Sequence, residues 1–275
     1  MWQKINPVKL EIFENTRITV HNSLQLVSAA ARAYLPSDTD DRQAELSWDS
    51  HRSMLWSKPF GPDHGIRVSL DMLKFVLSIR KNSGMTEHLV LSGMSYPLAF
   101  GWLQVKLEKL GLDPELFHDR QPYQMLDYRF DHSRELGVND TAAEELVKYF
   151  SNAEFVLSQV RRKYTNSTDL RIRPMQFDLS FTLPLQDHNM SMTFGFCPGD
   201  PSFIEPYFYV SMSPGPEQIE QAPELSRGFW FSGEWMGTVL MWSDIANLDM
   251  ERELTMVRNF YEEAAIACAS MFKKV

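Results

Sequence analysis

The side chains best suited to chemistry are a carboxylate and an imidazole in the second half of the chain. Asp178 lies in the run Pro174-Met-Gln-Phe-Asp-Leu179, and His188 follows ten residues later. Carboxylate and histidine groups act together as acid–base couples in many hydrolases. A strand rises about 3.3 Å per residue, so a hairpin turn at about Gln186 places Asp178 roughly 20 Å from His188. The spacing therefore argues against a catalytic dyad.

The same polar residues can instead line a binding site. Asp178 and Thr193 fall on the polar side of alternating runs, while Phe229-Trp-Phe231 must place a large ring on each face of its strand. Because binding pockets combine apolar walls with a few fixed polar groups, we expect Asp178 and Thr193, with Trp230 or a neighbouring ring, to line a cavity. The alternative for Asp178 is a salt bridge to a neighbouring arginine. The candidate ligand-binding residues are Asp178, Thr193, His188, Trp230 and His132.

Other catalytic and metal-binding patterns are incomplete. Gly93-Met-Ser-Tyr-Pro97 lies between a predicted strand and a predicted helix, as a nucleophile elbow does, but Pro97 replaces the glycine that the strained turn needs. Ser95 fits a helix N-cap better. The seven histidines show no ligand spacing such as His-x-His, and no glycine-rich phosphate loop is present. We expect no metal and no cofactor.

Composition excludes several classes of partner. The chain has 275 residues, 44% hydrophobic and 23% charged, as in soluble globular proteins. A formal net charge of −9 provides no basic surface for nucleic acid or anionic lipid. The first residues lack an apolar signal core, no run is long enough to span a membrane, and two cysteines make no disulfide framework. We predict a cytoplasmic protein in which Cys197 and Cys268 are reduced.

Alternating apolar residues predict the strands that position these side chains. The clearest element is a β-hairpin, in which apolar and polar residues alternate from Met175 to Leu183 and again from Met190 to Phe196. Residues 184–189 supply its turn. An amphipathic helix must cover the apolar face, and the candidates are residues 141–164 and 249–273.

Each half of the chain shows the same order of elements. Residues 1–112 and residues 141–275 each contain a helix, an antiparallel meander of about four or five strands and a second helix. In the first meander, alternation continues from Ile66 to Ile79. Residues 113–140 form an irregular connector, which we expect to act as a lid or binding loop because long irregular loops are often functional. The predicted class is α+β with two similar halves; an internal duplication and two unrelated halves both remain open.

Short motifs along nearly the whole chain resemble an uncharacterised bacterial family, the domain of unknown function DUF5996. The matching pieces are Thr16-Arg17, Phe75 to Ile79, Leu98 to Gly111, Pro174-Met-Gln-Phe-Asp-Leu179, His188 with Gly195-Phe-Cys-Pro-Gly199, and Tyr261-Glu-Glu-Ala-Ala265. The resemblance implies a shared fold and no established activity.

Three functions are compatible with these residues. The first is a small-ligand-binding protein with a cleft between its halves, closed by the connector. The second is a hydrolase-like enzyme that uses carboxylate and histidine groups of the second sheet. The third is an assembly module whose aromatic face makes a homodimer. Converging polar side chains in a concave pocket favour the first two, whereas a broad apolar patch without a pocket favours the third.

Overall fold

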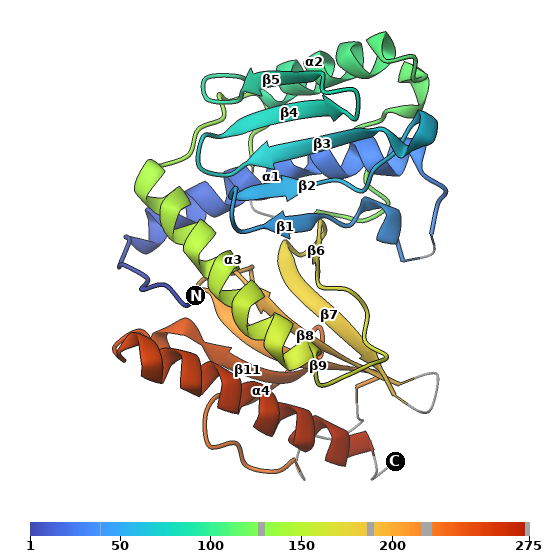
Figure 1. The fold of residues 1–275 in the computed structure, drawn as a ribbon. Helices are drawn as coiled ribbons and strands as arrows, with labels where there is room; N and C mark the ends of the chain where they lie inside the picture. Colours follow the sequence, from blue (N-terminus) through green and yellow to red (C-terminus); the bar gives the residue numbers. More distant parts are fainter. Residues whose placement is uncertain (39, 126–129, 186–189, 216–221, 273–275) are drawn as a thin grey trace. The chain divides into compact units, whose positions relative to one another are not determined.

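The protein is a mixed α+β fold with antiparallel sheets, as the sequence predicts (Figure 1). The computed structural model describes residues 1–38, 40–125, 130–185, 190–215 and 222–272. The chain divides into two compact units. Unit 1 comprises Met1–Asn6, Lys148–Arg171 and Asp178–Val275, and unit 2 comprises Pro7–Val147 and Ile172–Phe177. The predicted connector, residues 113–140, therefore belongs to unit 2.

Unit 2 is built on a long helix and a five-stranded meander. Helix α1 (Leu10–Tyr34) packs against β2 and β3 of this sheet. In sheet order, the strands are β1 (Ser47–Asp49), β2 (Met54–Trp56), β3 (Ile66–Asp71), β4 (Val76–Lys81) and β5 (Thr86–Val90). All neighbouring strands pair antiparallel, and helix α2 (Tyr96–Lys109) follows the last one.

Local residues account for the C-terminal ends of α1 and α2, and a serine and a proline mark the start of α2. Leu35 takes an extended backbone, with φ −110° and ψ 152°, because the ring of Pro36 disfavours a helical residue before it. Ser95 occupies the N-cap position of α2, and Pro97 lies in its first turn. Gly111 follows α2 with φ +84°, the left-handed conformation that commonly ends a helix.

The alternating run from Ile66 to Ile79 is two strands and not one. β3 ends at Asp71, four turn residues follow, and β4 begins at Val76. Phe75 is the last turn residue; its φ is +50°, which is rare for an aromatic residue, and its side chain is only 1% exposed. The apolar residues change from even positions, up to Met72, to odd positions, from Leu73, and this shift of phase marks the turn between the two strands.

Unit 1 holds most of the second sheet and the two helices that cover it. Helix α3 (Asp140–Arg161) enters this unit at Lys148, and helix α4 (Met250–Phe272) follows the last strand. The second sheet has six strands in the order β10-β11-β9-β8-β7-β6. Their bounds are β6 (Arg171–Arg173), β7 (Asp178–Pro184), β8 (Ser191–Cys197), β9 (Tyr207–Ser213), β10 (Phe229–Ser232) and β11 (Met236–Met241).

The predicted hairpin is confirmed in β7 and β8. Phe181 pairs with Phe194, and their rings stack with centroids 4.9 Å apart. Phe194 contacts Tyr261 of α4, while Phe196 on the same face contacts Tyr149 of α3. Both candidate helices therefore cover the apolar face of the hairpin.

The hairpin starts later than the alternation predicts. β7 begins at Asp178, so Met175 and Phe177 precede the strand. Phe177 belongs to unit 2, where its ring stacks on His21 with centroids 5.2 Å apart. Phe177 is the last residue of a four-residue turn and has a φ of +57°. Phe75 has the same position in its turn and a similar φ.

The two aromatic turn residues begin similar sequences. Phe75-Val-Leu-Ser-Ile79 and Phe177-Asp-Leu-Ser-Phe181 each start with a buried phenylalanine at positive φ and continue into a strand. The strand orders differ, however. The sheet of unit 2 is a simple meander, whereas β9 pairs with β11 in the second sheet and leaves β10 at the edge. The internal duplication stays a prediction.

Candidate functional site

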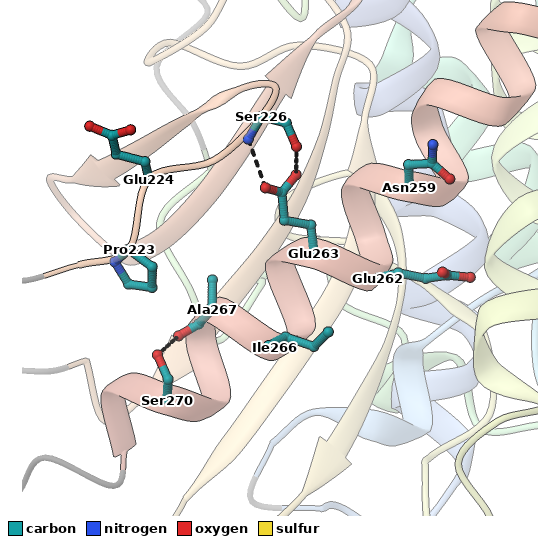
Figure 2. Close-up of a pocket in the computed structure, with 9 residues that line it drawn as sticks. All are labelled: Pro223, Glu224, Ser226, Asn259, Glu262, Glu263, Ile266, Ala267 and Ser270. Carbon is teal, nitrogen blue, oxygen red and sulfur yellow. Dashed lines mark hydrogen bonds between the residues drawn. The ribbon is translucent and has the colours of Figure 1, made fainter.

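One face of α4 lines a pocket in unit 1, shown in Figure 2. The residues on the helix recur at steps of three and four, which places them on one side of it; they are Asn259, Glu262, Glu263, Ile266, Ala267 and Ser270. The opposite wall consists of Pro223, Glu224 and Ser226. The pocket has a volume of about 640 Å³.

Two sets of hydrogen bonds hold the loop that forms the opposite wall. The carboxylate of Glu263 accepts hydrogen bonds from the backbone N–H and the hydroxyl of Ser226, at 2.7 and 2.6 Å, and Figure 2 shows both. The indole N–H of Trp230 donates to the carbonyl of Pro223 at 2.8 Å. Trp230, a residue expected to bind ligand, therefore supports the wall without lining the pocket.

The pocket combines apolar walls with negative charge. Ile266 is 74% exposed and supplies an apolar surface between the polar residues of α4. Glu262 forms an ion pair with Lys163, just past the end of α3. The lining residues include three glutamates and, within the described part of the chain, neither lysine nor arginine. A ligand with a cationic group and an apolar group matches this lining.

Asp178 and Thr193 lie on the face of the second sheet opposite the apolar side chains of β7 and β8. Thr193 pairs with Thr182, and the two hydroxyl oxygens are 3.0 Å apart. Asp178 precedes Thr182 by four residues on the same strand, which corresponds to about 13 Å at 3.3 Å per residue. The two expected site residues share a face but do not meet.

The carboxylate of Asp178 is buried against a tyrosine. Asp178 is 1% exposed, and its Oδ2 accepts a hydrogen bond from the hydroxyl of Tyr209. Tyr209 pairs with Gly195, and a Cβ atom added at position 195 would lie 2.3 Å from Cζ of its ring. The glycine thus makes room for the tyrosine ring.

Trp230 lies on the other face of the sheet, beneath α4. It pairs with Thr238, which lies next to Cys268 of α4. The tryptophan on the same face of the sheet as Asp178 is Trp235. Its ring centroid is 5.5 Å from that of Tyr209. The sequence of β10 does not show which face of the sheet Trp230 occupies. The register with β11 decides this, and it places Trp230 on the face opposite Asp178.

The two histidines among the expected residues are not in the described part of unit 1. His132 lies in the connector of unit 2, where its exposed ring meets Tyr96 and Phe130 edge-on, with centroids 4.9 and 5.0 Å apart. His188, with the turn that carries it, lies outside the described residues. The pairing of His188 with Asp178 stays untested.

A polar network fastens the connector to α1. Arg32 donates from Nε and Nη2 to the carboxylate of Asp41, at 2.9 and 2.7 Å, and from Nη2 to the hydroxyl of Tyr123 at 3.3 Å. The Tyr123 hydroxyl donates in turn to Gln25 at 2.9 Å. Burial raises the pKa of Tyr123 to about 12, so it remains a neutral donor at physiological pH. A lid role for this connector stays a prediction.

A metal site, a membrane span and a reactive thiol each have requirements with which the described residues can be compared. Within them, no group of three or more His, Cys, Asp and Glu side chains can hold a metal ion, and no helix is long and apolar enough to cross a membrane. Cys197 and Cys268 are buried free thiols. Burial raises the pKa of both, that of Cys268 to about 12, so neither forms a nucleophilic thiolate at neutral pH.

None of the residues that line the α4 pocket is among the site residues expected from the sequence. The sequence of α4 does contain one indication of the pocket, an apolar residue outside the core face of the helix. The core stripe of the helix includes Val257, Tyr261 and Cys268, and Ile266 stands among polar residues on another face. An isolated exposed isoleucine is ordinary by itself. The second wall, residues 223–226, is distant in sequence, so only the tertiary fold completes the pocket.

Comparison with known proteins gives no relative from which a role could be transferred. The chain matches no protein-family model, no curated protein and no solved structure. The resemblance to DUF5996 therefore stays an expectation from the sequence. The geometry of the site is the basis for a functional proposal.

Proposed function

We propose that the protein binds a small molecule in the α4 pocket, and that this molecule carries an amine attached to an apolar group. The observation that carries the proposal is a pocket of about 640 Å³ whose lining pairs apolar side chains with three glutamates. Small-ligand pockets of roughly 300 to 1,000 Å³ usually have apolar walls and a few polar groups that orient the ligand.

Glu263 is the proposed anchor for the amine. It points from α4 toward Ser226 across the pocket (Figure 2), and each of its oxygens accepts one hydrogen bond from that residue. An ionised carboxylate has about four acceptor positions, so an ammonium group can donate to the remaining ones without displacing the loop. Glu224 adds a second negative charge to the same lining, whereas Lys163 neutralises Glu262.

The apolar part of the ligand would lie against Ile266, Ala267 and Pro223. Ile266 is 74% exposed. Covering its side chain removes apolar surface from water, which is favourable by about 25 cal/mol per Å². Affinity should therefore increase with the length of the alkyl chain until the pocket is filled.

Calorimetric titration with hexylamine, butylamine and hexanol tests the proposal. We expect hexylamine to bind more tightly than butylamine, and hexanol to bind at least about tenfold more weakly, because hydrogen bonds to charged groups contribute about 1.5 to 3 kcal/mol. Equal affinities for hexylamine and hexanol would contradict the proposed role of the carboxylates.

Two glutamate variants locate the effect. Glu263→Gln keeps an acceptor oxygen for Ser226 and removes the charge, so it should weaken hexylamine binding about tenfold or more. Glu251→Gln, an exposed change in the first turn of α4 outside the pocket, should leave the affinity unchanged. If both variants bind like the unmodified protein, the amine is not held in this pocket.

Other expectations from the sequence remain proposals beside this one. They are a cytoplasmic location, membership of the DUF5996 family, a ligand cleft between the halves and a homodimer formed through an aromatic face. Native mass spectrometry of the purified protein tests two of them together, because it reports a retained small molecule and the number of subunits.

A further inference from the structure

Residues 1–6, which form no helix or strand, belong to unit 1, although residues 7–147 belong to unit 2. Trp2 and Ile5 are buried in this segment, whereas the side chain of Gln3 is exposed. We call residues 1–6 the arm. Three residues that hydrogen-bond to it, Asn152, Leu248 and Glu253, form what we call the seat.

Asn152 of α3 recognises the backbone of the arm. Its Oδ1 accepts a hydrogen bond from the N–H of Gln3, and its Nδ2 donates to the carbonyl of Gln3, both at 2.7 Å. Asn152 is 1% exposed. One side chain thus satisfies both backbone groups of a single residue, as a neighbouring strand does in peptide recognition by strand addition. This contact selects an extended backbone and is indifferent to the side chain of Gln3.

Glu253, in the first turn of α4, recognises the side chains on either side of Gln3. Its Oε2 accepts a hydrogen bond from the indole N–H of Trp2 at 2.9 Å, and its Oε1 accepts one from the ammonium group of Lys4 at 2.5 Å. The same ammonium group donates to the carbonyl of Leu248 at 2.9 Å. Glu253 is 0% exposed. A buried carboxylate that loses its cation is strongly unfavourable, so Glu253 requires this partner.

We propose that the seat is a peptide-recognition site for an extended Trp-x-Lys segment, and that it accepts residues 2–4 of a second copy of this chain when its own arm is not seated. All seat groups lie on α3, on α4 or just before α4, so recognition does not depend on the covalent link to Pro7. A tethered arm has a high effective concentration and wins at low protein concentration. A second copy presents identical chemistry, and exchange of an identical element is a common route to dimers.

Peptide binding to a chain whose arm is impaired tests the recognition. The protein carries Trp2→Ala and Lys4→Ala, and the probe is synthetic Met-Trp-Gln-Lys-Ile-Asn amide. We expect calorimetry to show one peptide bound per chain. Three changes in the peptide should each lower the affinity at least about tenfold: Trp→Ala, Lys→Gln, and methylation of the backbone nitrogen of the glutamine. The matched control is the Gln→Ala peptide, which alters only the exposed side chain and should bind like the original.

The protein is the same in every titration, so differences between peptides cannot come from its folding. Equal binding of all peptides, or no binding of the original peptide to the folded variant, would overturn the proposal. If the variant does not fold, the unmodified chain replaces it. Its Trp2 indole N–H resonance should then shift when excess original peptide displaces the arm, and stay in place with the Lys→Gln peptide.

Mixing two variants of the full chain tests exchange between copies. One variant carries Trp2→Ala and Lys4→Ala, and the other carries Asn152→Ala and has an intact arm. Native mass spectrometry should show a one-to-one pair of the two variants in the mixture and no such pair when the second variant also carries Lys4→Gln. Absence of the pair in the first mixture, with both variants folded, would refute recognition in trans.

Discussion

The ring of Tyr209 covers Gly195 on the neighbouring strand, and its hydroxyl hydrogen-bonds to the buried carboxylate of Asp178. Three residues on three strands therefore depend on one another. Position 195 must lack a side chain, since a Cβ atom there would lie 2.3 Å from the tyrosine ring, far inside van der Waals contact. Displacement of the ring would also remove a hydrogen bond from Asp178.

Gly195→Ala should lower the free energy of unfolding by about 2 to 4 kcal/mol, because it adds overpacking to the loss of a buried hydrogen bond. Urea denaturation measures the loss. Gly101→Ala in α2 is the control, because an added Cβ there has no atom within 4 Å. The control should be neutral or slightly stabilising, as alanine is favoured over glycine in helices. Similar effects of the two changes would contradict the close contact at position 195.

Phe177→Ala should cost about 3 to 5 kcal/mol, the range of large-to-small changes in a core. Phe177 is 1% exposed and stacks on His21 within unit 2, so the substitution leaves a cavity there. Leu73→Ala, in the other four-residue turn, removes a side chain that is 39% exposed and should cost much less. A loss below about 1 kcal/mol for Phe177→Ala would show that its ring is not part of the core.

Folding stability should decrease at alkaline pH because of Cys268. Burial raises its pKa from 9.0 to about 12. The folded state holds this proton more tightly than the unfolded state, so the stabilisation is complete below pH 9 and is lost as the pH rises toward 12. Between pH 9 and 12, the unfolding free energy of Cys268→Ala should therefore fall less steeply with pH than that of the unmodified protein. The two slopes should differ by up to about 1.4 kcal/mol per pH unit. Denaturation curves recorded across this range give the unfolding free energy at each pH. If it falls equally steeply with pH for both proteins, the assignment to Cys268 is refuted.

Tyr123→Phe should loosen the connector. The substitution removes the hydroxyl that donates to Gln25 and accepts from Arg32, and we expect a loss of about 1 to 2 kcal/mol. Hydrogen exchange of the described connector amides should accelerate. Ser133→Ala, an exposed change in the same connector, should alter stability by less than about 0.5 kcal/mol. Unchanged exchange in Tyr123→Phe would mean that other contacts alone hold the connector.

Much of the secondary structure could be predicted from local residue patterns. A proline after Leu35 and a glycine at position 111 end helices through backbone geometry that depends only on neighbouring residues. Alternation in the β7 and β8 region predicted the buried face of the hairpin, because successive strand residues point to opposite sides. The same alternation failed at Phe177, a turn residue at positive φ that keeps the apolar period although the strand begins only at Asp178. At Phe75 the apolar positions change from even to odd numbers, so the break there was visible in the sequence.

The sequence by itself determined the α+β class, the C-terminal ends of α1 and α2 and the inward faces of the central strands, since each depends on residues only a few positions apart. Tertiary structure alone decided which polar groups meet. Trp230 and Asp178 were separated by strand register, and the walls of the α4 pocket come from distant segments. Lys4 and Glu253 are 249 positions apart, and no local pattern marks either as the partner of the other. The two meet because packing buries the carboxylate of Glu253 at a position that the ammonium group of Lys4 can reach.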